Sequence, residues 1–234
     1  MNVNKYDIFH VHTYRCGHAE NVDDEEYIKK AMSIGATGIW FTDHAPFPGD
    51  PFGNRMKYAE LDEYIETLSF LKRKYSTKLN IHIGLEIEYF PTYDKKGYYK
   101  ELFDRKEIEI MMLGQHMAET DSEHYTFEWD AKRRISEEYV ALGNAQIQGL
   151  NSGYFNVIAH PDRIFKRQKC WSEKMAKLSE KTINTARQTN TPLEINESSK
   201  QQPYHYWQEF WAMTDGVQHI HGLDAHSLKE IKLI

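Results

Sequence analysis

Seven short apolar runs, rich in β-branched and aromatic residues, alternate along this chain with segments whose apolar residues recur at helical spacing. Such alternation is typical of a parallel sheet, because parallel strands need a long crossover between them, usually a helix. An open doubly wound sheet and a closed barrel both satisfy the pattern, so the alternation alone leaves the two open. The expected strands are YDIFHVH, TGIWFTDH, LNIHIGLEIEY, IEIMMLGQH, FNVIAHPD, TPLEINES and QHIHGLDAH.

Four segments have clear helical spacing, with Asp or Ser near their starts and Gly or Asn near their ends. No Gly-rich turn follows the first run, so a dinucleotide-binding fold has no support. The chain has 234 residues and neither a linker nor a low-complexity segment divides it. We therefore expect a single domain over residues 1–234, a normal size for one barrel. The expected helices lie within 22–36, 58–75, 130–150 and 172–190.

Composition limits the class of partner and the compartment. The net charge of −6 argues against a nucleic-acid surface, which needs Lys and Arg to neutralise phosphates, but metal ions would let such a protein bind a small anion. No segment approaches the roughly 20 apolar residues that span a bilayer, and the first residues resemble a strand rather than a signal peptide. Cys16 and Cys170 are too few for a disulfide framework, so we expect a cytoplasmic protein with free thiols.

Six of the seven runs carry side chains near their ends that can bind a metal ion. In a parallel barrel the carboxyl ends of all strands open on one face, so residues far apart in the sequence would meet there. His10 and His12 are two residues apart, which on a strand points both to one face and lets them grip one ion. The side chains are His10, His12, Asp43, His44, Glu86, Glu88, His116, His160, Asp162, Asp224 and His226.

A single histidine at a strand end is more often a hydrogen-bonded structural residue than a ligand. Recurrence in almost every strand weakens that interpretation, because so many clustered polar groups are costly to bury without a compensating ion. Cys16 lies among these histidines, but Val22 stands where a cysteine phosphatase needs an Arg, so we expect a thiol without a catalytic role. The histidines that we expect to be structural are His82, His124, His205, His219 and His221.

With these residues in place, the chain resembles the PHP (polymerase and histidinol phosphatase) family, most closely its histidinol-phosphate phosphatase branch, from about residue 5 to residue 227. Each motif is weak alone, and their order, spacing and completeness carry the resemblance. It implies an α/β fold, a distorted (β/α)₇ TIM-like barrel with the metal site at the carboxyl ends of the strands. The motifs are HVHTYRCGHA, FTDHAPFP, GLEIEYFP, LGQHM, IAHPDRI and GLDAHS.

The resemblance also implies three divalent transition-metal ions (zinc, iron or manganese). Glu86 would bridge two of them, with Glu88 as the competing bridge, and Glu86, Asp224 and His226 would act most directly in catalysis. The implied ligands are His10, His12 and Asp224 at the first ion, Glu86 between the first and second, His116 and His160 at the second, and His18, His44 and His226 at the third.

The implied function is hydrolysis of L-histidinol phosphate to L-histidinol and phosphate, in histidine biosynthesis, by attack of a metal-bridging hydroxide. Several ions sharing one water lower its pKa enough to make hydroxide at neutral pH. The small phosphorylated substrate should also meet a fixed cation, because guanidinium binds phosphate through two parallel hydrogen bonds. Arg163, directly after HPD, is the first candidate and Arg15 the second.

Three other functions stay open at this point. A related PHP phosphatase would act on phosphotyrosine or a small sugar phosphate. An amidohydrolase also begins with H-x-H, but that class usually bridges its metals with a Lys on the fourth strand, and here the fourth run ends in GQH. A non-catalytic metal-binding module is disfavoured, because it needs no open three-metal face.

Overall fold

The protein is described by a computed structural model, which covers residues 3–121 and 124–234. Seven parallel strands form one sheet in the order β1-β2-β3-β4-β7-β8-β9, and the fold is that of a distorted (β/α)₇ barrel. Neighbours in this sheet follow each other in sequence, whereas a doubly wound sheet reverses its order part-way. The expected fold class is confirmed. The strands are β1 Asp7–Val11, β2 Gly38–His44, β3 Asn80–Ile87, β4 Ile110–Leu113, β7 Val157–Ile158, β8 Leu193–Asn196 and β9 His219–Gly222.

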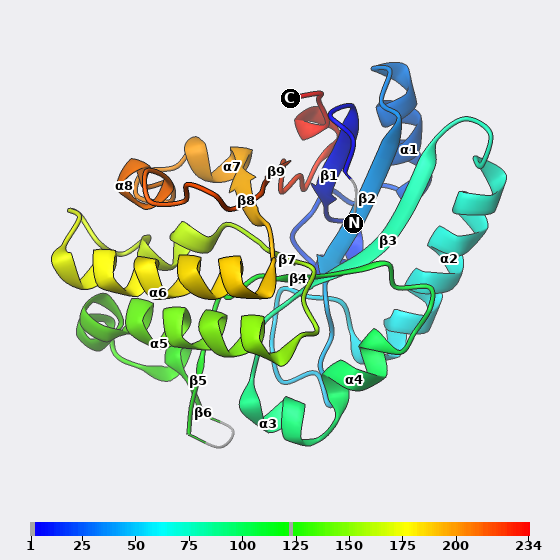
Figure 1. The fold of residues 1–234 in the computed structure, drawn as a ribbon. Helices are drawn as coiled ribbons and strands as arrows, with labels where there is room; N and C mark the ends of the chain where they lie inside the picture. The colour runs from blue at the N-terminus through cyan, green and yellow to red at the C-terminus, as the bar shows by residue number, and fades with distance from the viewer. Residues whose placement is uncertain (1–2, 122–123) are drawn as a thin grey trace. The chain divides into compact units, whose positions relative to one another are not determined.

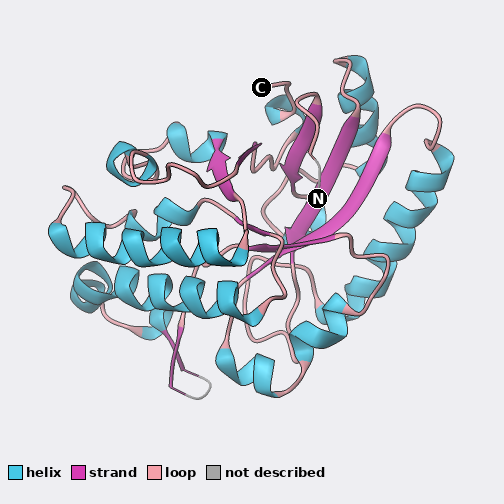
Figure 2. Cartoon of the chain, in the orientation of Figure 1, coloured by secondary structure: helices cyan, strands magenta, loops and turns pink. Residues whose placement is uncertain are grey.

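Helices connect most of these strands, and the four expected helical segments are confirmed as α1, α2, α5 and α6 (Figure 2). The sequence predicted a strict alternation of strands and helices, and the structure departs from it. Short helices follow β3 and β8, and an antiparallel hairpin of β5 (Glu119–Asp121) and β6 (His124–Tyr125) comes before α5. The helices are α1 Asp24–Ser33, α2 Leu61–Lys74, α3 Pro91–Lys95, α4 Tyr98–Phe103, α5 Ala131–Ser152, α6 Glu173–Thr189, α7 Glu197–Lys200 and α8 Gln208–Trp211.

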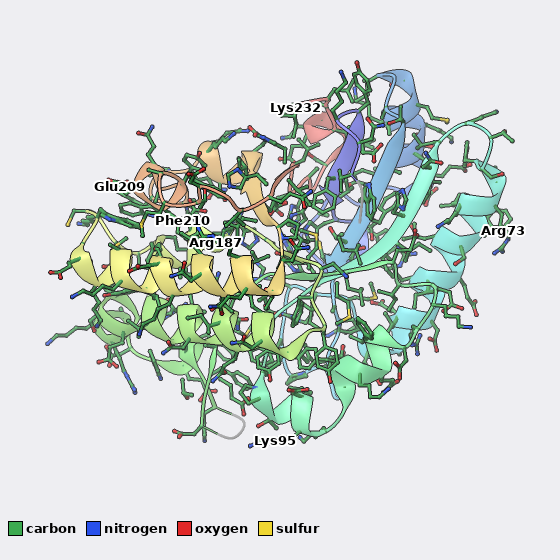
Figure 3. All side chains as sticks on the ribbon, viewed as in Figure 1. Arg73, Lys95, Arg187, Glu209, Phe210 and Lys232 are labelled. Atoms are coloured by element: carbon green, nitrogen blue, oxygen red, sulfur yellow. The ribbon has the colours of Figure 1, made fainter. Side chains whose placement is uncertain are left out.

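The chain divides into two compact units, and the first comprises Met1–Glu86, Arg105–Met111 and His221–Ile234. In it β1, β2 and β3 lie side by side (Figure 1), and β2 is buried along its whole length. A strand buried on both faces explains the continuous apolar run in the sequence. The basic last turn of α2, where Arg73 points away from the strands (Figure 3), lies where cations are favoured by the helix dipole.

Close packing in the first unit depends on one glycine of β3. A Cβ at Gly84 would lie only 2.8 Å from the carbonyl oxygen of Ile110, so no other residue fits there without a backbone shift. The hydroxyl of Tyr64, on α2, donates to the Gly84 carbonyl at 2.9 Å in a fully buried position. This contact ties α2 to the strand that carries Glu86.

The second unit comprises Ile87–Asp104 and Met112–Ile220 and contains the long helices α5 and α6, which lie side by side (Figure 1). A Cβ at Gly143 would lie 2.6 Å from Leu178 Cδ2, so glycine permits the two helices to approach. The expected capping is present, since Asp130 accepts from the Arg133 amide and Ser172 from the Met175 amide. Over 3–121 and 124–234, the structure contains no helix both long enough and apolar enough to traverse a membrane.

Candidate metal centre

His10 and His12 come together at the end of β1, but the backbone there does not follow the regular alternation of a strand. The register between β1 and β2 shifts between Ile8 and Val11, and His10 adopts a left-handed conformation with φ of 68°. A side chain other than Gly rarely takes this conformation, and such strain concentrates at functional sites. The two imidazoles still converge, with ring centroids 4.9 Å apart, so the pairing was predicted correctly and its geometric reason was wrong.

The segment after β9 reaches the same place from the far end of the chain. The His12 amide donates to the Ala225 carbonyl at 2.9 Å, and the Ala225 amide donates to the His10 carbonyl at 3.0 Å. Asp224, between Leu223 and Ala225, also has a positive φ, of 56°. The backbone bonds therefore fix Asp224 beside the paired histidines.

A carboxylate oxygen of Glu86 lies at the centre of the first unit's cluster. Glu86 Oε2 is 3.4 Å from His10 Nε2, 3.5 Å from His12 Nε2 and 3.1 Å from His44 Nδ1. His44 ends β2 and pairs in register with Glu86 on β3, which explains why these two meet. Asp224 Oδ1 lies 3.3 Å from His12 Nε2 and 3.6 Å from His10 Nε2. Nitrogen and oxygen atoms so arranged can hold a metal ion.

A second group of possible ligands consists of His18, His44 and His226, whose ligand atoms lie within 4.8 Å of one another. His18 Nδ1 is 3.0 Å from the Cys16 carbonyl, and His226 Nδ1 is 3.0 Å from the Asp224 carbonyl. A carbonyl only accepts, so each Nδ1 donates and the Nε2 lone pair is left for a metal ion. Among the described residues, the buried His226 Nε2 has no hydrogen-bond partner.

The electrostatic setting of this cluster favours the neutral form of His12. Burial, followed by the proximity of His226, lowers the pKa of His12 to about 3. At neutral pH His12 is therefore uncharged, which is the form that binds metals. The buried Nε2 of His12 lies 3.3 Å from Asp224 Oδ1 and 3.5 Å from Glu86 Oε2, but among the residues that the structure covers it makes no hydrogen bond of good geometry. Such an atom is costly to bury unless something binds it, so the donor set fits a metal ion.

Asp43, near the end of β2, contacts the residues that follow β1. Its Oδ1 accepts from the Thr13 amide at 2.7 Å, its Oδ2 accepts from the Thr13 hydroxyl, and His12 Nδ1 lies 3.8 Å from Oδ1. Burial raises the pKa of Asp43 to about 7, although the Thr13 bonds act to lower it. These contacts support the backbone beside the ligand histidines.

Arg15 and Cys16, which lie between the ligand histidines in sequence, are both buried. Arg15 Nη1 donates to both carboxylate oxygens of Asp24, at 2.9 and 2.8 Å, and to the Thr13 hydroxyl at 3.3 Å. This pairing favours a structural role, and phosphate binding by Arg15 stays a prediction. Burial raises the pKa of the Cys16 thiol to about 12, so the thiol is protonated at neutral pH and a poor nucleophile.

The second unit contains its own group of predicted site residues. The rings of His116 and His160 have centroids 5.1 Å apart, and His116 Nδ1 lies 3.2 Å from Glu88 Oε1. His160 is left-handed, with φ of 30°, and its amide donates to Glu194 Oε2 at 3.0 Å. Sequence reasoning missed Glu194, although an acid inside the apolar run TPLEINES was an available signal.

Arg163 is held by the end of β8 and the helix after it. Its Nη2 donates to Asn196 Oδ1 at 3.0 Å and to Ser199 Oγ at 2.8 Å, and its Nε donates to Ser199 Oγ at 3.0 Å. Neighbouring Asp162 accepts at Oδ2 from the Trp207 amide and the Trp211 indole, at 2.8 and 2.9 Å. Asp162 therefore anchors the segment that leads into α8.

Two of the histidines outside the predicted ligand set, His82 and His124, make ordinary structural contacts. His82 stacks on Trp40, with ring centroids 3.7 Å apart, and its Nδ1 lies 2.9 Å from Glu109 Oε2. His124 Nδ1 lies 3.0 Å from Glu128 Oε2. Cys16 and Cys170 are free thiols, as expected.

Comparison with known proteins identifies the family of this chain. The model of a family described as the PHP domain matches residues 9–198. The chain belongs to the PHP domain family. Over 253 aligned residues the PHP protein is 26% identical to histidinol-phosphatase of Bacillus subtilis (strain 168), covering 95% of this chain and 94% of the relative.

Solved structures of similar fold carry related names. A Listeria monocytogenes protein assigned as the histidinol phosphatase hisK has a TM-score of 0.78 at 17% identity, covering 96% of this chain and 97% of that chain. Histidinol phosphate phosphatase from Lactococcus lactis subsp. lactis Il1403, complexed with Zn, L-histidinol and phosphate, has a TM-score of 0.69 at 16% identity, covering 96% and 87%. At these identities the likeness supports the PHP fold alone.

Proposed function

We propose that this PHP protein is a metal-dependent phosphomonoesterase that hydrolyses L-histidinol phosphate to L-histidinol and phosphate, as a step of histidine biosynthesis. The observation that carries the proposal is the buried cluster in which two histidines of the β1 end and His44 surround one oxygen of Glu86. Support comes from a relative named histidinol-phosphatase that aligns over nearly the full chain, and from a similar fold complexed with zinc, L-histidinol and phosphate.

We further propose three divalent ions, with zinc favoured because of that similar structure and with iron or manganese as alternatives for histidine-rich ligands. In the proposed centre, Glu86 would serve as a ligand to both the first and the second ion. The other ligands follow the family resemblance: His10, His12 and Asp224 for the first ion, His116 and His160 for the second, and His18, His44 and His226 for the third.

Bound ions would supply Lewis-acid polarisation of the phosphate oxygens and activation of the attacking water. The chain's own residues provide position and charge around that chemistry. The backbone fixes the strand ends that carry Glu86, Asp224 and His226, so the positions of these three side chains are set by the fold. His12 is neutral, so it does not have to lose a proton before it binds a metal. Arg163, fixed by Asn196 and Ser199, is the proposed cation for the phosphate.

Initial rates of phosphate release on a small panel test the proposal: histidinol phosphate, phosphotyrosine and a sugar phosphate, with metal content measured on the same sample. We expect more than one metal ion per chain and the highest kcat/KM on histidinol phosphate. Chelation should abolish the activity, and zinc should restore it. A preference for phosphotyrosine or the sugar phosphate would make the protein a PHP phosphatase of another specificity, and full metal content without phosphate release would indicate a binding module or an amidohydrolase.

Two further properties remain predictions with the proposed function. A soluble biosynthetic enzyme of this kind is expected in the cytoplasm. The whole chain, 1–234, is expected to act as a single PHP domain. Limited proteolysis that yields two separately stable fragments would contradict the second prediction.

A further inference from the structure

Glu88 follows Glu86 by two residues, and strand alternation would place both on one side. The structure gives them different partners. Glu88 is 1% exposed, and its Oε1 lies 3.2 Å from Nδ1 of His116, within the second unit. A carboxylate so deeply buried is costly unless it is hydrogen-bonded, and the imidazole N–H supplies such a bond.

The backbone on both sides of this contact is fixed by side chains of the same unit. The buried hydroxyl of Tyr99 donates to the Glu88 carbonyl at 2.8 Å and accepts from the Phe90 amide at 2.8 Å. The side chain of Gln115 accepts from the Tyr89 amide at 3.0 Å and donates to the Tyr89 carbonyl at 3.3 Å. Glu88 and His116 each adjoin a residue of the Tyr89–Gln115 pair, so their separation is set before any ligand binds.

A carboxylate bound to Nδ1 has a definite effect on the ring. Nδ1 must carry the proton, so the lone pair of a neutral imidazole is on Nε2, and the ring cannot turn about its χ angles without losing the bond. His18 and His226 donate through Nδ1 to backbone carbonyls instead. A charged acceptor makes the stronger bond and raises the basicity of the ring nitrogen opposite.

We propose that Glu88 is a positioning residue that fixes the tautomer and orientation of His116 for a metal ion, and does not itself bind the metal. This inference rests on the proposed function, because it assigns a metal to His116. It also gives different roles to two acids that strand alternation places on the same side: Glu86 is a ligand, as the family resemblance implies, and Glu88 acts through a ligand.

The test compares zinc affinities of full-length variants by competition with a chromophoric chelator. Loss of a carboxylate partner of a metal-bound histidine typically costs ten- to a hundredfold in metal affinity. Glu88→Ala should weaken one zinc equivalent by about that factor and leave the other equivalents unchanged. Glu88→Gln, which keeps an oxygen acceptor for Nδ1, should recover part of the loss.

A double-mutant cycle separates positioning from a general structural role. In the background of His116→Ala, the further change Glu88→Ala should weaken zinc binding no more, because the residue through which Glu88 acts is gone. Glu138→Gln is the matched control: Glu138 is a buried acid of the same unit, paired with Arg134 and Arg167. It should lower the melting temperature without changing the zinc isotherm.

Three results would overturn the proposal. One is a Glu88→Ala isotherm that superimposes on that of the wild type. Another is the loss of two equivalents at once, which would make Glu88 a bridging ligand. The third is full additivity in the double-mutant cycle: Glu88→Ala would weaken zinc binding by the same factor with His116 present and in the His116→Ala background, as a purely structural role predicts. The wild-type isotherm tests the proposed function separately, since a wild type that binds no zinc contradicts both.

Discussion

Arg15 lies between His12 and His18 in sequence, where a cation would suit a phosphate, yet its strongest contacts are with a buried acid. Arg15 and Asp24 are 6% and 3% exposed, and Nη1 lies 2.9 and 2.8 Å from the two carboxylate oxygens. Breaking such a pair by removing one partner costs about 3–5 kcal/mol, because the other charge stays buried without compensation.

We therefore expect Arg15→Met and Asp24→Asn each to lower the free energy of unfolding by about 3–5 kcal/mol. For a protein of this size that corresponds to a melting temperature lower by roughly 6–20 °C. The double variant Arg15→Met/Asp24→Leu should lose less than the sum of the single variants, because no charge is left buried alone. Urea denaturation at a fixed zinc concentration measures all three values.

The kinetics of the folded fraction complete this test. If Arg15 is structural, kcat/KM per folded molecule should stay within a few-fold of the wild type. Lys29→Ala is the control for the unfolding measurement. It removes an exposed ion pair, with Glu26, and should leave the free energy of unfolding nearly unchanged. Arg15→Met with wild-type stability and a ten- to hundredfold loss in kcat/KM would refute the reasoning and return Arg15 to phosphate binding.

Four further predictions concern single side chains. Glu86→Ala should lose bound metal and nearly all phosphate release, as elemental analysis and turnover would show together; retention of both would remove β3 from the centre. Arg163→Ala should lower kcat/KM roughly ten- to a hundredfold with metal content unchanged, since a charged hydrogen bond is worth about 1.5–3 kcal/mol; unchanged kinetics would remove it from the site. Cys16→Ser should keep most activity, and a trapped phosphocysteine would contradict this. Although burial acts to raise the pKa of Glu109, bonds from His82 and Lys72 lower it to about 2. A depressed pKa stabilises the fold above the unfolded value of 4.5 and ceases to do so as pH falls towards 2. The melting-temperature difference between wild type and Glu109→Gln should therefore shrink over that window, and a difference independent of pH would contradict the assignment.

The sequence was sufficient for the elements and for the kinds of residue at their ends. Alternation of period 2 and period 3.6 is a local property, so the seven strands and the helices α1, α2, α5 and α6 could be predicted. Parallel topology then required residues such as His10, His44 and Glu86 to meet, because strand ends share one face. The hairpin of β5 and β6 could not be predicted in this way, because its strands are too short to show a periodic pattern.

The partner of each polar side chain was decided only by tertiary structure. The left-handed backbone at His10 and Asp224 depends on a register shift and on bonds between chain segments more than 200 residues apart, which no local pattern encodes. Glu86 and Glu88 look alike in sequence, yet one meets His10 and the other meets His116. Residue type fixes what a side chain can bind, whereas burial and the fold's long-range contacts fix what it does bind.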